Sequence, residues 1–325
     1  MRSRFSPMDW VFVGSRPGLL VLTLGLVTLC GCFPSTLAGT VAPFTLRPQP
    51  VLPGSPLVPV SPRVVTGFLQ VAPDFKGDPS LHRSRNQGRA IVLLHGLQLH
   101  PFTAHAEETF LFRDWQKPGS HLVQELSKKG DVFAFSYSQN APVPTIAAGP
   151  DLGWDIQRLR NLGYSDIVLI GHSAGGLIAR QFVEDHPEAG VTKVIQVCAP
   201  NAGSNYARIE TGVSKDHRAF LESLTREARM QCLRERAHKI VPPGVQFVCV
   251  VGDGAGVGDG VVSTRSQWPL DLQEQGIPMI PLRTSHFTVM RSRTEAVKLA
   301  EIVASYYPRW DGAQVAVAKK KLRED

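Results

Sequence analysis

The sequence predicts an α/β fold built on a mainly parallel sheet. Short apolar runs rich in valine and isoleucine alternate along the chain with longer segments of helical periodicity. The clearest runs, residues 90–94 and 167–170, are apolar throughout, as expected of strands that are covered on both faces. With 325 residues, 43 % of them hydrophobic and 19 % charged, the chain has room for one large globular domain plus extensions.

Residues 1–31 have the pattern of an export signal. Arginines precede an apolar stretch, residues 18–29, that is too short to span a bilayer comfortably. The stretch runs into Leu-Cys-Gly-Cys, which resembles a bacterial lipobox and makes Cys32 the expected lipidation site. We therefore expect an exported lipoprotein of the cell envelope, anchored to a membrane. An ordinary cleaved signal, which gives a secreted or periplasmic soluble protein, and an uncleaved N-terminal membrane anchor are the alternatives.

The segments on either side of the folded domain differ from it in composition. Residues 32–62 contain recurrent prolines, which forbid a helix and favour an extended linker that would hold the domain away from a membrane. The domain itself is expected to cover residues 63–310. Residues 311–325, which include three consecutive lysines, are expected to form a charged, disordered tail.

The expected elements of the domain alternate in type. Strands are expected at residues 64–71, 90–94, 131–137, 167–170, 193–198, 245–251 and 279–282, and helices at residues 121–129, 151–162, 174–186 and 294–307. Asp151 is the expected N-cap of the second helix. A helical segment at 216–238 breaks the alternation, and it fits either a cap or lid within residues 201–240 or an ordinary outer helix.

Ser173 lies where the strand at 167–170 meets the helix that follows it. Glycines two residues before and two residues after the serine give the pattern Gly-X-Ser-X-Gly, which suits a tight strand-to-helix turn because larger side chains would clash there. Such a turn lifts the hydroxyl clear of the sheet and places the first amides of the helix beside it. Ser173 is therefore the predicted nucleophile, on a nucleophile elbow.

A serine hydroxyl needs a base to take its proton and an acid to orient that base. His286 is the only histidine beyond His238, and it falls between the last expected strand and the final helix, so it is the predicted base. Two aspartates are candidates for the acid. Asp253 directly follows a strand, which slightly favours it, and Asp259 lies in a glycine-rich segment a few residues further on.

Two backbone amides are expected to bind the oxyanion. The amide of Ala174 follows the nucleophile, and the amide of Leu97 lies in the loop after the strand at 90–94. His95, in the same loop, and His172, beside the serine, are interpreted as structural histidines.

Four stretches of the chain together resemble the α/β-hydrolase superfamily, and within it bacterial and plant-type lipases and esterases. They are His-Gly-Leu at 95–97, Gly-His-Ser-Ala-Gly-Gly at 171–176, Cys-Ala-Pro-Asn-Ala-Gly-Ser at 198–204 and Gly-Asp-Gly-Val-Val at 258–262. The resemblance implies an α/β-hydrolase fold with helices on both faces of the sheet. The fourth stretch matches the segment that carries the acid in this superfamily, which makes Asp259 the preferred acid over Asp253.

These expectations converge on a serine hydrolase that cleaves carboxylic esters of a small molecule or lipid through an acyl-enzyme. The same residues would also serve a thioesterase, an amidase or an acyltransferase, and a non-catalytic envelope lipoprotein is the alternative from another class. We expect no cofactor, no metal and no protein partner. A net charge of +7 without a basic stripe interleaved with aromatic residues argues against nucleic acid as a partner.

Five cysteines are present, of which the leader and the lipid would account for two. Cys198 and Cys249 lie in apolar strands and are expected to be buried. A bridge between Cys232 and Cys249 stays open as a possibility.

Overall fold

A computed structural model describes most of the chain from residue 63 onward. The described residues are 63–74, 80–84, 88–98, 108–208, 215–254, 256 and 258–324. The predicted export signal (residues 1–31), Cys32 and the linker lie outside them. Within the described part, no helix has the length and apolar character needed to cross a membrane.

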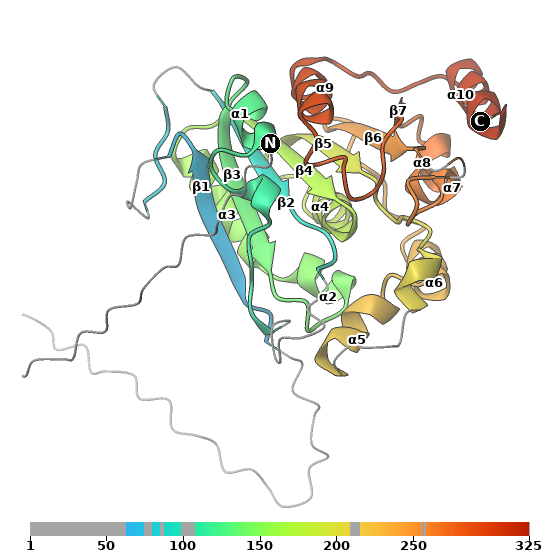
Figure 1. The fold of residues 1–325 in the computed structure, drawn as a ribbon, viewed down its shortest axis with the longest axis horizontal. Helices are drawn as coiled ribbons and strands as arrows, with labels where there is room; N and C mark the ends of the chain where they lie inside the picture. Colours follow the sequence, from blue (N-terminus) through green and yellow to red (C-terminus); the bar gives the residue numbers. More distant parts are fainter. Residues whose placement is uncertain are drawn as a thin grey trace, which may run out of the picture. The chain divides into compact units, whose positions relative to one another are not determined.

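Seven strands of the described residues form one sheet, in the order β1-β3-β2-β4-β5-β6-β7 (Figure 1). The strands are β1 (Thr66–Ala72), β2 (Arg89–Leu94), β3 (Asp131–Tyr137), β4 (Asp166–His172), β5 (Val191–Val197), β6 (Gln246–Gly252) and β7 (Met279–Leu282). The edge strand β1 pairs antiparallel with β3, and the other neighbouring pairs are parallel. Parallel pairing places the carboxyl ends of β2 to β7 at one edge of the sheet, where the predicted site residues follow.

Helices cover both faces of this sheet (Figure 1). The described helices are α1 (His121–Leu126), α2 (Val143–Ala148), α3 (Asp151–Asn161), α4 (Ala174–Asp185), α5 (Lys215–Glu222), α6 (Arg226–Glu235), α7 (Thr264–Gln267), α8 (Leu270–Glu274), α9 (Arg293–Ala304) and α10 (Gly312–Glu324). Apolar residues of α1 and α9 pack on one face, and those of α2, α3 and α4 pack on the other. This arrangement confirms the predicted fold class.

Side chains with hydrogen-bonding groups set where several helices begin. Ser120 accepts the amide of Val123 at the start of α1, and Thr225 accepts the amide of Ala228 at the start of α6. The prediction that Asp151 caps α3 is wrong, because Pro150 occupies the N-cap and Asp151 is the first helical residue. Its carboxylate still lies in the first turn, where the helix dipole favours negative charge.

The prediction of a disordered tail over residues 311–325 is also wrong. Residues 312–324 form α10, and Val315 and Ala318 on one face of it are buried in the same core as α4. Their spacing of three residues, with Leu322 one turn further on, gives the helix an apolar stripe. The three consecutive lysines lie between Ala318 and Leu322, and they are compatible with this helix because their side chains can point to solvent.

The helical segment predicted at 216–238 is two helices, α5 and α6, separated by a short turn. Phe220 on α5 and Arg229 on α6 are both buried.

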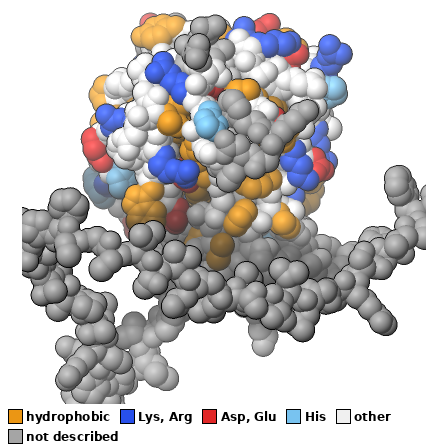
Figure 2. All heavy atoms as spheres, turned by 90° about the vertical axis from the view of Figure 1, so that its left-hand side faces the viewer, with side chains coloured by type: hydrophobic (Ala, Val, Ile, Leu, Met, Phe, Trp, Pro, Cys, Tyr) orange, Lys and Arg blue, Asp and Glu red, His pale blue; other side chains and the backbone are white. Residues whose placement is uncertain are grey.

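On the face of the molecule seen in Figure 2, lysine and arginine side chains lie among acidic and apolar ones rather than in a single patch.

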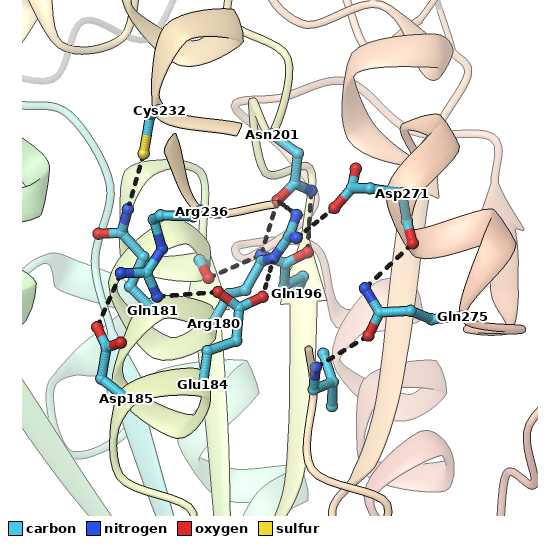
Figure 3. A network of polar contacts seen from close by, with 12 residues as sticks. Arg180, Gln181, Glu184, Asp185, Gln196, Asn201, Cys232, Arg236, Asp271 and Gln275 are labelled. Atoms are coloured by element: carbon cyan, nitrogen blue, oxygen red, sulfur yellow. Dashed lines mark hydrogen bonds and ion pairs between the residues drawn. The ribbon is translucent and has the colours of Figure 1, made fainter. Parts of the chain in front are cut away.

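A buried ionic network joins α6 to α4 and α8 (Figure 3). Arg180 on α4 donates to Glu184 Oε1 at 2.7 Å and also to the carboxylate of Asp271. Arg236, at the end of α6, donates to Glu184 Oε2 at 3.0 Å and to Asp185 at 2.9 Å. The side chains of Arg180 and Glu184 are only 6 % and 2 % exposed, so each charge depends on its partner rather than on water.

Replacing Arg180 by methionine is expected to lower the free energy of unfolding by about 3 kcal/mol, because it leaves a buried carboxylate with one cation fewer. Urea unfolding followed by circular dichroism measures this. The matched control is Lys128→Met, since Lys128 is 62 % exposed in its pair with Glu125 and is expected to contribute less than about 0.5 kcal/mol. Equal losses in the two variants would contradict the structural role of the network.

Candidate active site

Ser173 stands on a strained turn between β4 and α4. Its backbone has φ 53° and ψ −124°, in a region that residues other than glycine rarely adopt. A side chain at Gly175 would put a Cβ 2.4 Å from the carbonyl oxygen of His95, so this position requires glycine. Strain of this kind at a residue with a nucleophilic side chain is typical of a functional site.

The loop after β2 approaches the serine closely. A Cβ at Gly96 would lie 2.5 Å from the Cβ of Ser173 and 3.1 Å from its Oγ, so the backbone of this loop passes directly beside the hydroxyl. The amides of Leu97 and Ala174, predicted to bind the oxyanion, donate to no group in the part of the chain that the structure describes.

His286 and Asp259 form a buried pair. The Nδ1 of His286 and the Oδ2 of Asp259 lie 2.7 Å apart, and the amide of His286 donates to the Asp259 carbonyl at 2.9 Å. The other carboxylate oxygen, Oδ1, accepts the amides of Val261 and Val262 at 2.9 and 2.7 Å. Both carboxylate oxygens of Asp259 are thus hydrogen-bonded. Because Nδ1 of His286 faces this carboxylate, Nε2 is the ring nitrogen that remains to act as a base.

The electrostatics of this pair keep Asp259 ionised. Burial alone would raise the pKa of this carboxyl group, but the hydrogen bond to His286 and the two backbone amides lower it below its ordinary value. A charged acceptor requires a proton on Nδ1 of His286. That is the tautomer in which Nε2 can take a proton from a serine hydroxyl.

Asp253, the other candidate acid, makes no described hydrogen bond or ion pair with His286. Its amide donates to the Leu282 carbonyl, and its Oδ1 is buried without a hydrogen-bond partner among the described residues. The side chain instead lines a cavity of about 1130 Å³, together with Tyr206, Arg226 and Arg265. The residues that line this cavity do not include Ser173 or His286.

His172 connects the serine turn to the base. Its Nε2 lies 3.0 Å from the carbonyl oxygen of His286, and the two rings are 4.7 Å apart. A carbonyl can only accept, so Nε2 of His172 carries a proton. Burial, then the neighbouring His286, hold the pKa of His172 well below its usual value, so this ring stays neutral and structural, as predicted from its place in the turn.

The structure records no hydrogen bond between Ser173 and His286, both of which it describes. The two residues nevertheless share one edge of the sheet, because His172, which precedes Ser173, contacts His286 directly. Catalytic hydrogen bonds are often long in hydrolases without substrate and shorten when substrate binds.

His95 supports the loop that carries Leu97. Its Nε2 accepts the amide of Tyr137 at 3.2 Å, so the ring proton is on Nδ1, which lies 2.8 Å from the carbonyl oxygen of Gly96. The Tyr137 hydroxyl donates to the His95 carbonyl at 2.6 Å, and the two rings stack. His95 is thus structural, as predicted, and it acts on the loop that carries Leu97.

Cys198 lies beside Asp259 and His286, which the sequence analysis did not predict. It follows β5, is fully buried and has φ 54°. Its sulfur, an oxygen of Asp259 and a ring nitrogen of His286 all lie within 4.8 Å of one another. These three groups could hold a metal ion only by giving up the His286–Asp259 hydrogen bond, so the geometry favours the acid–base pair.

The three described cysteines are free thiols. Cys232 and Cys249 are both buried and are not bridged to each other. Burial, then the neighbouring Asp259, raise the pKa of Cys198, so that thiol stays protonated.

The mainly parallel sheet and the strand-to-helix turn that carries Ser173 are those of the α/β-hydrolase fold. No protein-family model matches the chain, and no curated protein matches its sequence. Among solved structures, the lipase BlEst2 of Bacillus licheniformis in its mature form is similar at 14 % identity and a TM-score of 0.53, over 75 % of this chain and 98 % of that one.

Two further structures share the fold. The propeptide form of the same lipase gives 13 % identity and a TM-score of 0.54, over 77 % of this chain and 55 % of that one. Phospholipase PlaB of Legionella pneumophila gives 14 % identity and a TM-score of 0.50, over 73 % and 63 %. At identities this low, the structural similarity shows a common fold and nothing further.

Proposed function

We propose that this protein is a serine hydrolase that cleaves carboxylic esters. The observation that carries the proposal is the buried His286–Asp259 pair at 2.7 Å, at the same edge of the sheet as a strained serine turn. The similar structures, named as a lipase and a phospholipase, support ester bonds of lipids as the substrate class.

The reaction follows from these positions. Nε2 of His286 takes the hydroxyl proton while Ser173 Oγ attacks the ester carbonyl, and Asp259 stabilises the imidazolium that forms. The amides of Leu97 and Ala174 bind the oxyanion of the tetrahedral intermediate. His286 then gives its proton to the leaving alcohol. Water, activated by the same histidine, cleaves the acyl-enzyme and regenerates the serine.

An apolar side chain beside the base supports an apolar acyl group. Phe287 follows His286 and is 69 % exposed, with its ring 5.8 Å from the ring of His286. An exposed aromatic ring at this position offers a surface on which an acyl chain can lose its contact with water.

Hydrolysis of p-nitrophenyl esters with acyl chains from two to sixteen carbons tests the proposal. We expect turnover of at least part of the series by purified protein. A folded protein that cleaves none of these esters, and that takes up no fluorophosphonate, would favour the non-catalytic alternative. Activity confined to thioester or amide analogues would favour a thioesterase or an amidase.

We also propose that the protein is exported and held at a membrane by a lipid on Cys32, which would place the site near lipid esters. Cys32→Ser is expected to move the full-length product from the membrane fraction to the soluble fraction. Immunoblots of fractions from cells that export the full-length chain measure this. Continued recovery with the membrane would argue against lipidation, and Cys232→Ser serves as the control that should stay with the membrane.

A further inference from the structure

The direction of the Leu97 amide depends on what holds the peptide group before it. In a trans peptide the carbonyl and the following N–H point in opposite directions, so the Gly96 carbonyl fixes the Leu97 N–H. That carbonyl oxygen lies 2.8 Å from Nδ1 of His95 and 3.0 Å from Nε2 of Gln139. Gln139 follows β3 and is 4 % exposed.

Gln139 contacts the loop on both sides of Leu97. Its Nε2 donates to the Gly96 carbonyl, and its Oε1 accepts the amide of Gln98 at 3.0 Å. A carbonyl can only accept and an amide N–H can only donate, so these two backbone groups determine which way the Gln139 side chain faces. One side chain thus clamps the residues that flank the predicted oxyanion donor.

His217, on α5, completes this arrangement. Its Nε2 lies 3.0 Å from the Oε1 of Gln139, and the ring is 3 % exposed. Since the orientation of Gln139 is set by the backbone, Oε1 must accept here and Nε2 of His217 must carry a proton. The side-chain amide of Gln139 therefore makes three hydrogen bonds. Two go to Gly96 and Gln98 in the loop, and the third goes to His217 on α5, which is distant in the sequence.

Helix α5 docks on the same segment at two further places. Ser223, the residue directly after α5, accepts the amide of Val143 through its Oγ at 3.0 Å, and the buried ring of Phe220 on α5 lies 6.3 Å from the ring of Tyr137. These contacts fix α5 relative to residues 137–143, the segment that carries Gln139. The position of α5 is thereby linked to the loop beside the serine.

We propose that Gln139 is a positioning residue of the oxyanion hole, and that His217 of α5 holds Gln139 in place. This inference rests on the proposed ester hydrolysis. Gln139 touches neither substrate nor the reacting atoms, and it acts by aiming the Leu97 N–H. Because the oxyanion forms only along the reaction path, loss of this aim should lower kcat and leave KM nearly unchanged.

The test compares Gln139→Leu with wild type, using p-nitrophenyl butyrate and the full chain. The active fraction of each sample is counted by fluorophosphonate titration, so that misfolded molecules do not count. We expect kcat to fall about 10²-fold with KM changed less than about threefold. Gln157→Leu, a glutamine on α3 that bonds only to Asn161 on its own helix, is the matched control and should keep the wild-type kcat.

Two readouts separate positioning from a general loss of structure. The affinity for a trifluoromethyl ketone, whose tetrahedral adduct carries an oxyanion, should fall in parallel with kcat/KM. His217→Gln, which keeps an N–H donor, should stay within about threefold of wild type, whereas His217→Leu should lose about tenfold in kcat. If Gln139→Leu does not fold, the two His217 variants test the inference in its place.

A wild-type kcat in Gln139→Leu, or equal losses in the two His217 variants, would overturn the inference while leaving the proposed function in place. A wild-type protein without ester hydrolysis and without a phosphonate adduct would overturn the proposed function, and this inference with it.

Discussion

Replacing Ser173 by alanine is expected to lower kcat for ester hydrolysis by about 10⁶-fold, leaving only the contribution of the oxyanion amides and of substrate binding. Ser173 has a strained backbone, and its Oγ would lie 3.1 Å from a Cβ built at Gly96, beside the loop that carries Leu97. Initial rates with purified protein measure the loss, and circular dichroism checks the fold.

The control is Ser127→Ala, which removes a surface hydroxyl that bonds only to the Gln124 carbonyl, and it should keep wild-type kcat. Residual activity above about 1 % of wild type in Ser173→Ala, after contaminating esterases are excluded, would mean that another group is the nucleophile.

Replacing Asp259 by asparagine is expected to lower kcat by about 10⁴-fold. The carboxylate holds the proton of His286 on Nδ1, while the Val261 and Val262 amides bind its other oxygen. An amide at this place would favour the wrong tautomer of His286 and could not stabilise the imidazolium. The same rate measurement tests this.

Asp253→Asn is the matched control, because Asp253 lies six residues away in the sequence and makes no described hydrogen bond or ion pair with His286 or Ser173. Its kcat should stay within about threefold of wild type. A larger loss in Asp253→Asn than in Asp259→Asn would reverse the assignment of the acid.

Much of the fold could be predicted because strand and helix patterns are local. The apolar runs at 90–94 and 167–170 became β2 and β4, and the glycines around Ser173 marked the turn between β4 and α4. The partner of His286 was harder to predict. Position after a strand favoured Asp253, but only the resemblance at 258–262 pointed to Asp259, whose loop curls back so that its own amides bind the carboxylate.

The remaining features depend on contacts between residues far apart in the chain, which periodicity does not report. Gln139 and His217 are 78 residues apart, and Arg180 and Asp271 are 91 apart. Cys198 was predicted as a buried strand residue, and it is buried, but its positive φ and its proximity to Asp259, which is 61 residues away in the sequence, could not be predicted from a local pattern. The apolar face of α10 was missed because the tail is rich in lysine and because that face packs against residues far away in the sequence.

Acylation of Ser173 with the help of His286 is the decisive step of the proposed reaction. Incubation with a fluorophosphonate, followed by the mass of the intact protein and of its peptides, tests this most directly. We expect a single adduct, on Ser173, formed much more slowly in His286→Ala. An adduct on another residue, or none in a protein that hydrolyses esters, would contradict it.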